Sequence, residues 1–194
     1  MQVPKDPEAF FSSYLPATFE PLRAKLGETS SPGAVVFRVG ERPPLAVRIV
    51  KGALECVEAV PEDAIVQISV SLDDFEPILV QGAELLLADH ADVERQLAVL
   101  RALTLDEERV QLIRAVKGSV AFVLEENGTE RRVTLTPGSQ RANVAVAECT
   151  VRAQLSDFLA MQRGAVNPFE LLMNGKIQLS GDAQIAMALS SLLV

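Results

Sequence analysis

The chain has 194 residues, enough for one ample domain or two small ones packed together. Acidic residues outnumber basic ones by 26 to 18, and the formal net charge of −8 argues against nucleic acid and anionic lipid as partners. Hydrophobic residues make up 48% of the chain, whereas aromatic residues make up 5% and Trp is absent. This mostly aliphatic content fits a large core, a lined cavity or a hydrophobic subunit interface.

Cysteine usage and the start of the chain indicate a reducing cytoplasm. Cys56 and Cys149 lie far apart in the sequence and without metal-ligand spacing. Residues 1–6 lack a charged head followed by an apolar signal core, and no apolar run reaches the roughly 20 residues that a membrane span needs. We therefore expect a cytoplasmic protein that has no metal site and no stable insertion in a membrane.

The first part of the chain predicts helices followed by a hairpin and two further strands. Residues 7–26 place apolar side chains close to helical spacing, which predicts one or two short amphipathic helices. Alternating apolar residues predict strands at 34–39 and 45–50, joined as a hairpin across a turn that contains Gly and Pro. Gly52 opens a third, weaker strand, and residues 64–72 form a longer fourth one.

The middle of the chain predicts three elements before the pattern begins again. Residues 73–80 indicate a short helix or turn, 84–87 a brief strand, and 90–103 a helix with its apolar residues on one face. A second amphipathic helix follows at 106–117. These elements place helices and a strand directly after the fourth strand of the first half.

The last part of the chain predicts a second hairpin, a further strand and a final helix. Strands at 119–125 and 131–136 flank an Asn-Gly pair at 127–128, which is a strong turn signal. Residues 175–181 alternate polar and apolar side chains as a half-buried strand does. After Asp182, which suits a helix N-cap, the chain carries no charge, and this predicts a helix buried on both sides.

The two halves share a pattern in the same order, which favours an internal duplication. Residues 33–37 match residues 118–122 as Gly-x-Val-x-Phe, at an offset of 85 (118 minus 33). The Asp-Phe pair at 74–75 matches the pair at 157–158 at an offset of 83 (157 minus 74). Short matches arise by chance, but the unchanged order of hairpin, strand, Asp-Phe and apolar helix makes duplication the better interpretation.

Beyond these matches the first half is shorter than the second. The span from Gly82 to Asp89 has the same length as the span from Gly175 to Asp182, seven positions in each case (89 minus 82 and 182 minus 175). The offset rises from 83 at the Asp-Phe pairs to 93 at these glycines (175 minus 82), so the first half drops a stretch equivalent to residues 159–168. We expect ligand binding in the C-terminal half and a structural role for the N-terminal half.

Several loose motifs follow one another in the second half: Ala147 to Val151, Asp157-Phe158, Gly164, Asn167-Pro168, Gly175 to Gly181 and Ile185 to Leu189. In this order and spacing they resemble the sterol carrier protein two domain, also called the nonspecific lipid-transfer protein family. The resemblance is clearest over residues 118–193, and a degenerate form recurs in the N-terminal half.

The resemblance implies an α+β fold, a twisted and mainly antiparallel sheet with helices on one face, here duplicated as units 1–103 and 104–194 packed together as one body. It implies an apolar tunnel between sheet and helices that holds a fatty acid, an acyl chain or a sterol-like lipid, and it implies no catalytic residues and no cofactor. Ten apolar side chains are expected to line the tunnel: Phe158, Leu159, Met161, Phe169, Leu172, Met173, Ile185, Met187, Leu189 and Leu192.

Residues that could carry chemistry have simpler structural interpretations. His90 is the only histidine, and its i, i+4 spacing to Glu94 suits a metal pair, but a solvated first turn of a helix explains both residues better. Asp73 and Asp74 adjoin on a turn, where they suit capping better than paired acid–base work. Cys149 lies on an alternating strand and is expected to be a small buried residue.

Two functions stay open at this point. The first is noncatalytic binding or transfer of a hydrophobic ligand. The alternative is an accessory or scaffold protein that uses the same fold to bind a partner enzyme or itself, as a homodimer or with a partner protein. A third interpretation, an enzyme such as a cyclase with a repurposed cavity, requires His90 to face an enclosed pocket.

Overall fold

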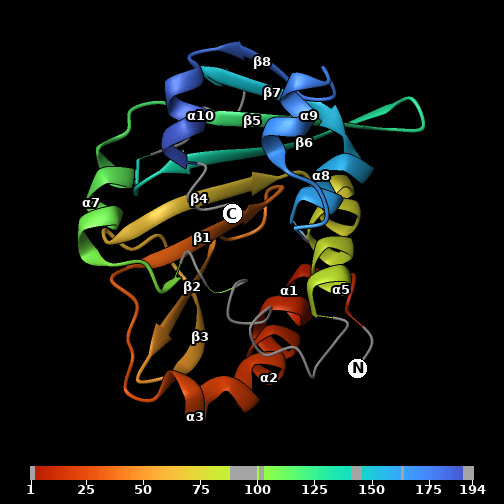
Figure 1. Ribbon diagram of the computed structural model, residues 1–194. Helices are drawn as coiled ribbons and strands as arrows, with labels where there is room; N and C mark the ends of the chain where they lie inside the picture. The colour runs from red at the N-terminus through yellow and green to blue at the C-terminus, as the bar shows by residue number, and fades with distance from the viewer. Residues whose placement is uncertain (1–2, 88–99, 101–102, 141–145, 163, 190–194) are drawn as a thin grey trace.

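The computed structural model describes residues 3–87, 100, 103–140, 146–162 and 164–189. In this part of the chain eight strands form one sheet in the order β3-β2-β1-β4-β6-β5-β7-β8. Helices pack on one face of this sheet, with the N-terminal helices at its lower end and the C-terminal ones at its upper end in Figure 1. The fold is α+β, as the sequence predicts.

The strands of the first half confirm the ranges that alternation of apolar residues predicts. Their bounds are β1 (Ala34–Val39), β2 (Leu45–Val50), β3 (Ala53–Glu58) and β4 (Ala64–Val70). β1 and β2 form an antiparallel hairpin, and β4 lies parallel to β1 on its other side.

The second half repeats this connectivity with its own strands. Their bounds are β5 (Val120–Glu126), β6 (Thr129–Pro137), β7 (Cys149–Gln154) and β8 (Gln178–Gly181). Asn127 and Gly128 form the hairpin turn with φ values of 51° and 80°, the left-handed conformation that a two-residue turn needs and that Asn and Gly adopt readily. β7 then lies parallel to β5, as β4 lies parallel to β1.

Sequence offset and topology agree across the two halves. Ala64 begins β4 and Cys149 begins β7, at an offset of 85 (149 minus 64), which is also the offset between Gly33 and Gly118. This agreement supports the duplication, which stays a proposal. The halves join where β4 pairs antiparallel with β6, so both contribute to a single sheet.

Within the described ranges the helices fall into four groups along the chain. The first group is a helical path made of α1 (Pro7–Ala9), a π-helical turn η1 (Phe10–Tyr14), α2 (Leu15–Phe19), a 3-10 turn η2 (Glu20–Leu22) and α3 (Arg23–Leu26). The second is α4 (Leu72–Phe75), a π-helical turn η3 (Glu76–Val80) and α5 (Gln81–Leu87). The third is α7 (Glu107–Ala115), and the fourth is α8 (Leu155–Gln162), α9 (Pro168–Met173) and α10 (Ala183–Leu189).

The strand predicted at 84–87 is wrong, because these residues belong to helix α5. The match between Gly82 and Gly175 therefore fails structurally, since Gly82 is helical and Gly175 precedes a strand. In the first half β6 occupies the position beside β4 that β8 occupies beside β7. Of the helix predicted at 90–103, all but residues 100 and 103 lie outside the described residues, and so do Asp89, His90 and Glu94.

The turn at the start of α4 is capped by a residue other than the predicted aspartates. The backbone N–H of Asp74 donates to Ser71 Oγ at 3.0 Å, so Ser71 is the N-cap. The carboxylate of Asp74 instead accepts from the backbone N–H of Arg132 at 3.1 Å and pairs with the Arg131 guanidinium at 3.5 Å. Asp74 therefore ties α4 to β6, a strand that the sequence does not place beside it.

One apolar cluster joins the two halves under the helices. Its fully buried members come from both halves and include Phe11, Leu22, Ile65, Phe75, Val110, Leu124 and Leu189. The rings of Phe10 and Phe75 meet edge to face with centroids 5.6 Å apart, which fixes the N-terminal helices against α4.

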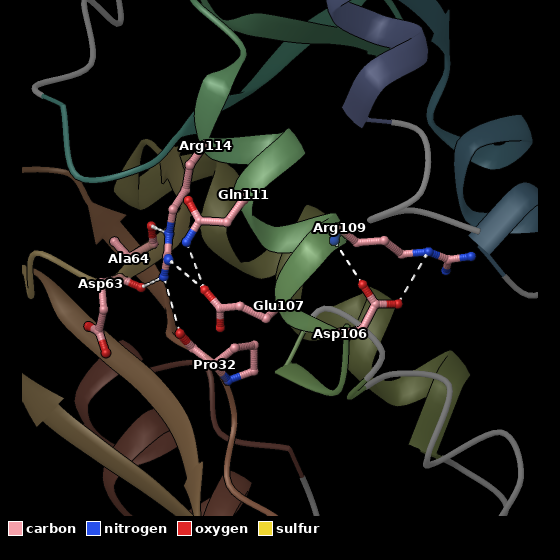
Figure 2. Close-up of polar contacts among 8 residues, drawn as sticks. All are labelled: Pro32, Asp63, Ala64, Asp106, Glu107, Arg109, Gln111 and Arg114. Atoms are coloured by element: carbon pink, nitrogen blue, oxygen red, sulfur yellow. Dashed lines mark hydrogen bonds and ion pairs between the residues drawn. The ribbon is translucent and has the colours of Figure 1, made fainter.

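An arginine on α7 adds a polar link between the halves (Figure 2). Arg114 donates from Nε to the carbonyl oxygen of Ala64 at 3.2 Å, and from Nη2 to the carbonyl oxygens of Pro32, at 3.2 Å, and Asp63. These oxygens lie just before or at the start of β1 and β4. A Cβ on Gly33 would overlap the Asp63 carbonyl oxygen, so this close approach of two backbones requires glycine.

Candidate functional site: the apolar interior of the C-terminal half

The floor of the candidate site is formed by alternate residues of two parallel strands. Val120 and Phe122 of β5 lie beside Cys149 and Val151 of β7 in the strand register. All four side chains are buried in the main apolar cluster. Since side chains alternate across a strand, these pairs form two apolar rows that face the helices.

The roof comes from α8 and α10. Phe158 and Leu159 of α8 and Ile185 and Leu189 of α10 are buried in the same cluster, and the Phe158 ring lies 5.5 Å from that of Phe122. Met161 is partly buried and packs against the cluster. Five of the ten predicted lining residues therefore belong to this cluster or pack against it, and their contact with a ligand stays a prediction.

Glu148 fixes the position of α10 on the sheet. Its carboxylate Oε2 accepts from the Ser119 backbone N–H at 2.7 Å and from the Ser119 hydroxyl at 3.2 Å. The Ser119 backbone N–H holds the pKa of the Glu148 carboxyl below its ordinary value. The carbonyl oxygen of Glu148 accepts from the Asp182 N–H at 2.9 Å, and Asp182 Oδ1 accepts from the Gln184 N–H at 2.9 Å. Asp182 is thus the helix cap that the sequence predicts.

Two glycines allow this close packing. A Cβ on Gly118 would lie 2.8 Å from Ile185 Cδ1, and a Cβ on Gly181 would overlap the Glu148 carbonyl oxygen. The sequence indicates these glycines as turn formers but gives no sign that they contact α10 and Glu148. The role of Glu148 is missed as well, although an acidic residue, Asp63, also directly precedes β4.

Four of the predicted lining residues lie at the surface. Phe169, Leu172 and Met173 of α9 are 76%, 39% and 85% exposed, and Met187 of α10 is 65% exposed. Within α9 the buried residue is Leu171. Because α9 has apolar residues on most of its circumference, composition alone does not tell which of them faces inward. Contact of these four residues with a ligand stays a prediction, and Leu192 lies outside the described residues.

The two cysteines, Cys149 on β7 in this interior and Cys56 on β3 in the other half, are poor nucleophiles. Burial raises the pKa of the Cys149 thiol, and burial raises the pKa of Cys56 to about 11, so both thiols are protonated at neutral pH and are weak nucleophiles. Within the described ranges no group of three or more His, Cys, Asp or Glu side chains could hold a metal ion. No helix in the described part of the chain has the length and apolar run that crossing a bilayer requires.

Part of this chain is similar to known proteins. Curated relatives include sterol carrier protein 2 from Homo sapiens, 28% identical over 95 residues, and from Gallus gallus, 30% identical over 95 residues. Each alignment covers 45% of this chain, which spans 17% of the relative's length.

Solved structures that are similar to part of this chain include sterol carrier protein 2 from Yarrowia lipolytica in its apo form, at 16% identity and a TM-score of 0.34, covering 42% of this chain and 76% of that one. Sterol carrier protein 2 like 2 from Aedes aegypti, at 22% identity and a TM-score of 0.31, covers 49% of this chain and 95% of that one. The SCP-2 sterol transfer family matches residues 97–194, whereas the N-terminal part is not covered. Since the match takes in just over half of the residues, the chain belongs to the SCP-2 sterol transfer family.

Proposed function

We propose that the C-terminal half binds a hydrophobic ligand, a fatty acid, acyl chain or sterol-like lipid, and transfers it without catalysis. The proposal rests on one observation: the residues that match the family are also those that form the apolar interior. The segment that matches the SCP-2 sterol transfer family, residues 97–194, supplies β5, β7, α8 and α10, which enclose the apolar interior. The curated relatives are named sterol carrier proteins, which supports a lipid as the ligand class.

The interior has the chemistry that a lipid ligand needs. Phe158, Leu159, Ile185 and Leu189 present aliphatic and aromatic surface, and Met161 adds a flexible side chain at the edge of the cluster. A ligand that enters between these helices and the strands gains about 25 cal/mol for each Å² of apolar surface removed from water, before ordering costs. Within this interior the raised pKa of the Cys149 thiol makes it a weak nucleophile at neutral pH.

Lipid extraction from the purified protein, followed by mass spectrometry and by displacement of a fluorescent fatty acid, tests the proposal. Leu189→Arg places a charge in the interior and is expected to abolish binding. Because Leu189 is fully buried, Met161→Arg, at the partly buried edge, provides a second variant less prone to unfold. Leu112→Arg is the matched control, since Leu112 is exposed on α7 and outside the interior. Wild-type protein without copurified lipid and without displacement would sink the proposal.

The alternative, an accessory or scaffold protein, is favoured by one observation, the exposure of large apolar side chains on α9 and α10. Such surfaces mark protein contacts in other proteins. A light-scattering mass at twice the monomer, with no lipid uptake, would favour this alternative.

The N-terminal half is proposed to be structural. β6 fills the place beside β4 that β8 fills beside β7, and the SCP-2 sterol transfer family match begins only at residue 97. The units 1–103 and 104–194 and the cytoplasmic location stay predictions.

A further inference from the structure

Helix α9 presents an apolar stripe to solvent. Phe169, Leu172 and Met173 are separated by three and four positions, which places them on one side of the helix. Their exposed fractions are 76%, 39% and 85%. A surface helix ordinarily carries charged residues on its solvent side, so this arrangement is inverted.

Hydrogen bonds at both ends of α9 and the burial of Leu171 hold the helix that carries the stripe in place. Asn167 Oδ1 accepts from the Phe169 N–H at 2.9 Å at the start of α9, and Leu171 anchors the helix by its burial. At the end of α9 the Leu171 carbonyl oxygen accepts from the N–H groups of Lys176 and Ile177 at 2.9 and 3.2 Å. The Lys176 ammonium lies 3.2 Å from an oxygen of Asp157, which ties this corner to α8.

The three side chains of the α9 stripe are by themselves too few for a stable protein interface. A large apolar or aromatic side chain covers roughly 150–250 Å² even when it is wholly buried, so three partly exposed ones offer well under the roughly 800 Å² per partner of a stable protein interface. Binding to a bilayer does not require so large a contact area. An amphipathic segment lies at the membrane surface with its apolar face buried about 5–10 Å into the boundary between headgroups and acyl chains.

Charge points to a neutral bilayer surface. From residue 167 to residue 189 the charged residues are Glu170, Lys176 and Asp182, and Lys176 is paired with Asp157. The chain as a whole carries −8. Such a surface gains nothing from anionic headgroups, and an uncharged apolar stripe suits a zwitterionic lipid surface.

We propose that α9 is the membrane-docking element of this chain, with Phe169, Leu172 and Met173 entering the boundary between headgroups and acyl chains of a zwitterionic bilayer. The inference rests on the proposed function and deepens it. α9 directly follows α8, which carries Phe158 and Leu159 of the apolar interior, so docking brings that interior to the lipid source.

The absence of Trp from the chain makes insertion measurable with a single reporter. Met173→Trp places the reporter in the stripe, and Leu112→Trp places a matched one at an exposed site on α7. With phosphatidylcholine vesicles that carry brominated acyl chains, we expect a blue shift and quenching for Met173→Trp and neither for Leu112→Trp. Absence of quenching for Met173→Trp, or equal quenching of both, overturns the proposal.

Vesicle sedimentation provides the second arm. Phe169→Ser combined with Met173→Ser is expected to lower partitioning into phosphatidylcholine vesicles about tenfold for each side chain, whereas Leu112→Ser leaves it unchanged. Partitioning that survives the double substitution, or that requires anionic lipid, contradicts docking by α9. So does a wild-type dimer in light scattering that the double substitution converts to a monomer. Fatty-acid binding by the wild type without vesicles tests the proposed function separately.

Discussion

At the scale of single residues, Arg114 shows how one side chain can join distant segments. Its guanidinium donates hydrogen bonds to the carbonyl oxygens of Pro32, Asp63 and Ala64, which lie 82, 51 and 50 positions away in the sequence. On the same helix, Arg109 pairs with Asp106 at 3.7 Å in a contact that is open to solvent (Figure 2). The two arginines therefore provide a natural comparison between a structural and a surface cation.

Replacing Arg114 by Ala is expected to lower the free energy of unfolding by about 2–3 kcal/mol, because it leaves three carbonyl oxygens at the start of β1 and β4 without their charged donor. Arg109→Ala is expected to change it by less than about 0.5 kcal/mol, since exposed ion pairs contribute little. Urea denaturation followed by circular dichroism measures both. Equal losses for the two variants would contradict the role of Arg114 as a link.

Some residue roles can be predicted from sequence and others cannot, for a physical reason. The cap at Asp182 is local, since the acceptor and its donor are two positions apart, and the sequence predicts it. The ties made by Asp74 to Arg132 and by Ser119 to Glu148 span 58 and 29 positions. Such pairs depend on which strands become neighbours, and this information is absent from local patterns.

At the scale of elements, hairpins and strands follow from sequence more reliably than α5 does. The turn at Asn127 and Gly128 has specific backbone requirements, so its residues identify it. The four residues 84–87 are too few to separate a period of two from a period of 3.6, and they continue a helical path that begins at Leu72. The exposed side of α9 is also unpredictable, because its apolar residues surround the helix.

Gly82 gives a test of the helical assignment of α5. A Cβ there would lie 3.5 Å from Gln162 Oε1 and 4.0 Å from Leu159 Cδ2, which are ordinary contacts. Gly82→Ala is therefore expected to raise the free energy of unfolding by about 0.5–1 kcal/mol, the usual gain from replacing glycine within a helix.

Gly33→Ala is the contrasting substitution for the same denaturation measurement. It is expected to destabilise the protein, because the new Cβ overlaps the Asp63 carbonyl oxygen. If Gly82→Ala lowers stability as Gly33→Ala does, the packing of α5 against α8 is tighter than these distances indicate.

At the scale of the whole molecule, the two halves share both their sheet and their core. The β4–β6 ladder runs from the pair Val66 and Pro137 to the pair Val70 and Val133. The apolar cluster contains buried side chains from both sides of this ladder. The α+β class is predicted from the family resemblance and the duplication is proposed from the repeat, but the joining of β4 to β6 is predicted by neither, because nothing local specifies it.

We expect the chain to unfold in one cooperative transition, since neither half can lose its strands without exposing the edge and core of the other. Differential scanning calorimetry should give a single peak whose calorimetric and van't Hoff enthalpies agree. Two resolved peaks would show that units 1–103 and 104–194 unfold independently.

The place of β6 between β4 and β5 also has a consequence for synthesis on the ribosome. When residues 1–70 have emerged, β4 has its neighbour β1 on one side and nothing on the other, since its second partner ends at Pro137. An unpaired edge of a nascent sheet invites pairing with the wrong strand. We therefore expect the free edge of β4 to stay unpaired until the β5–β6 hairpin has left the exit tunnel and β6 can pair with it.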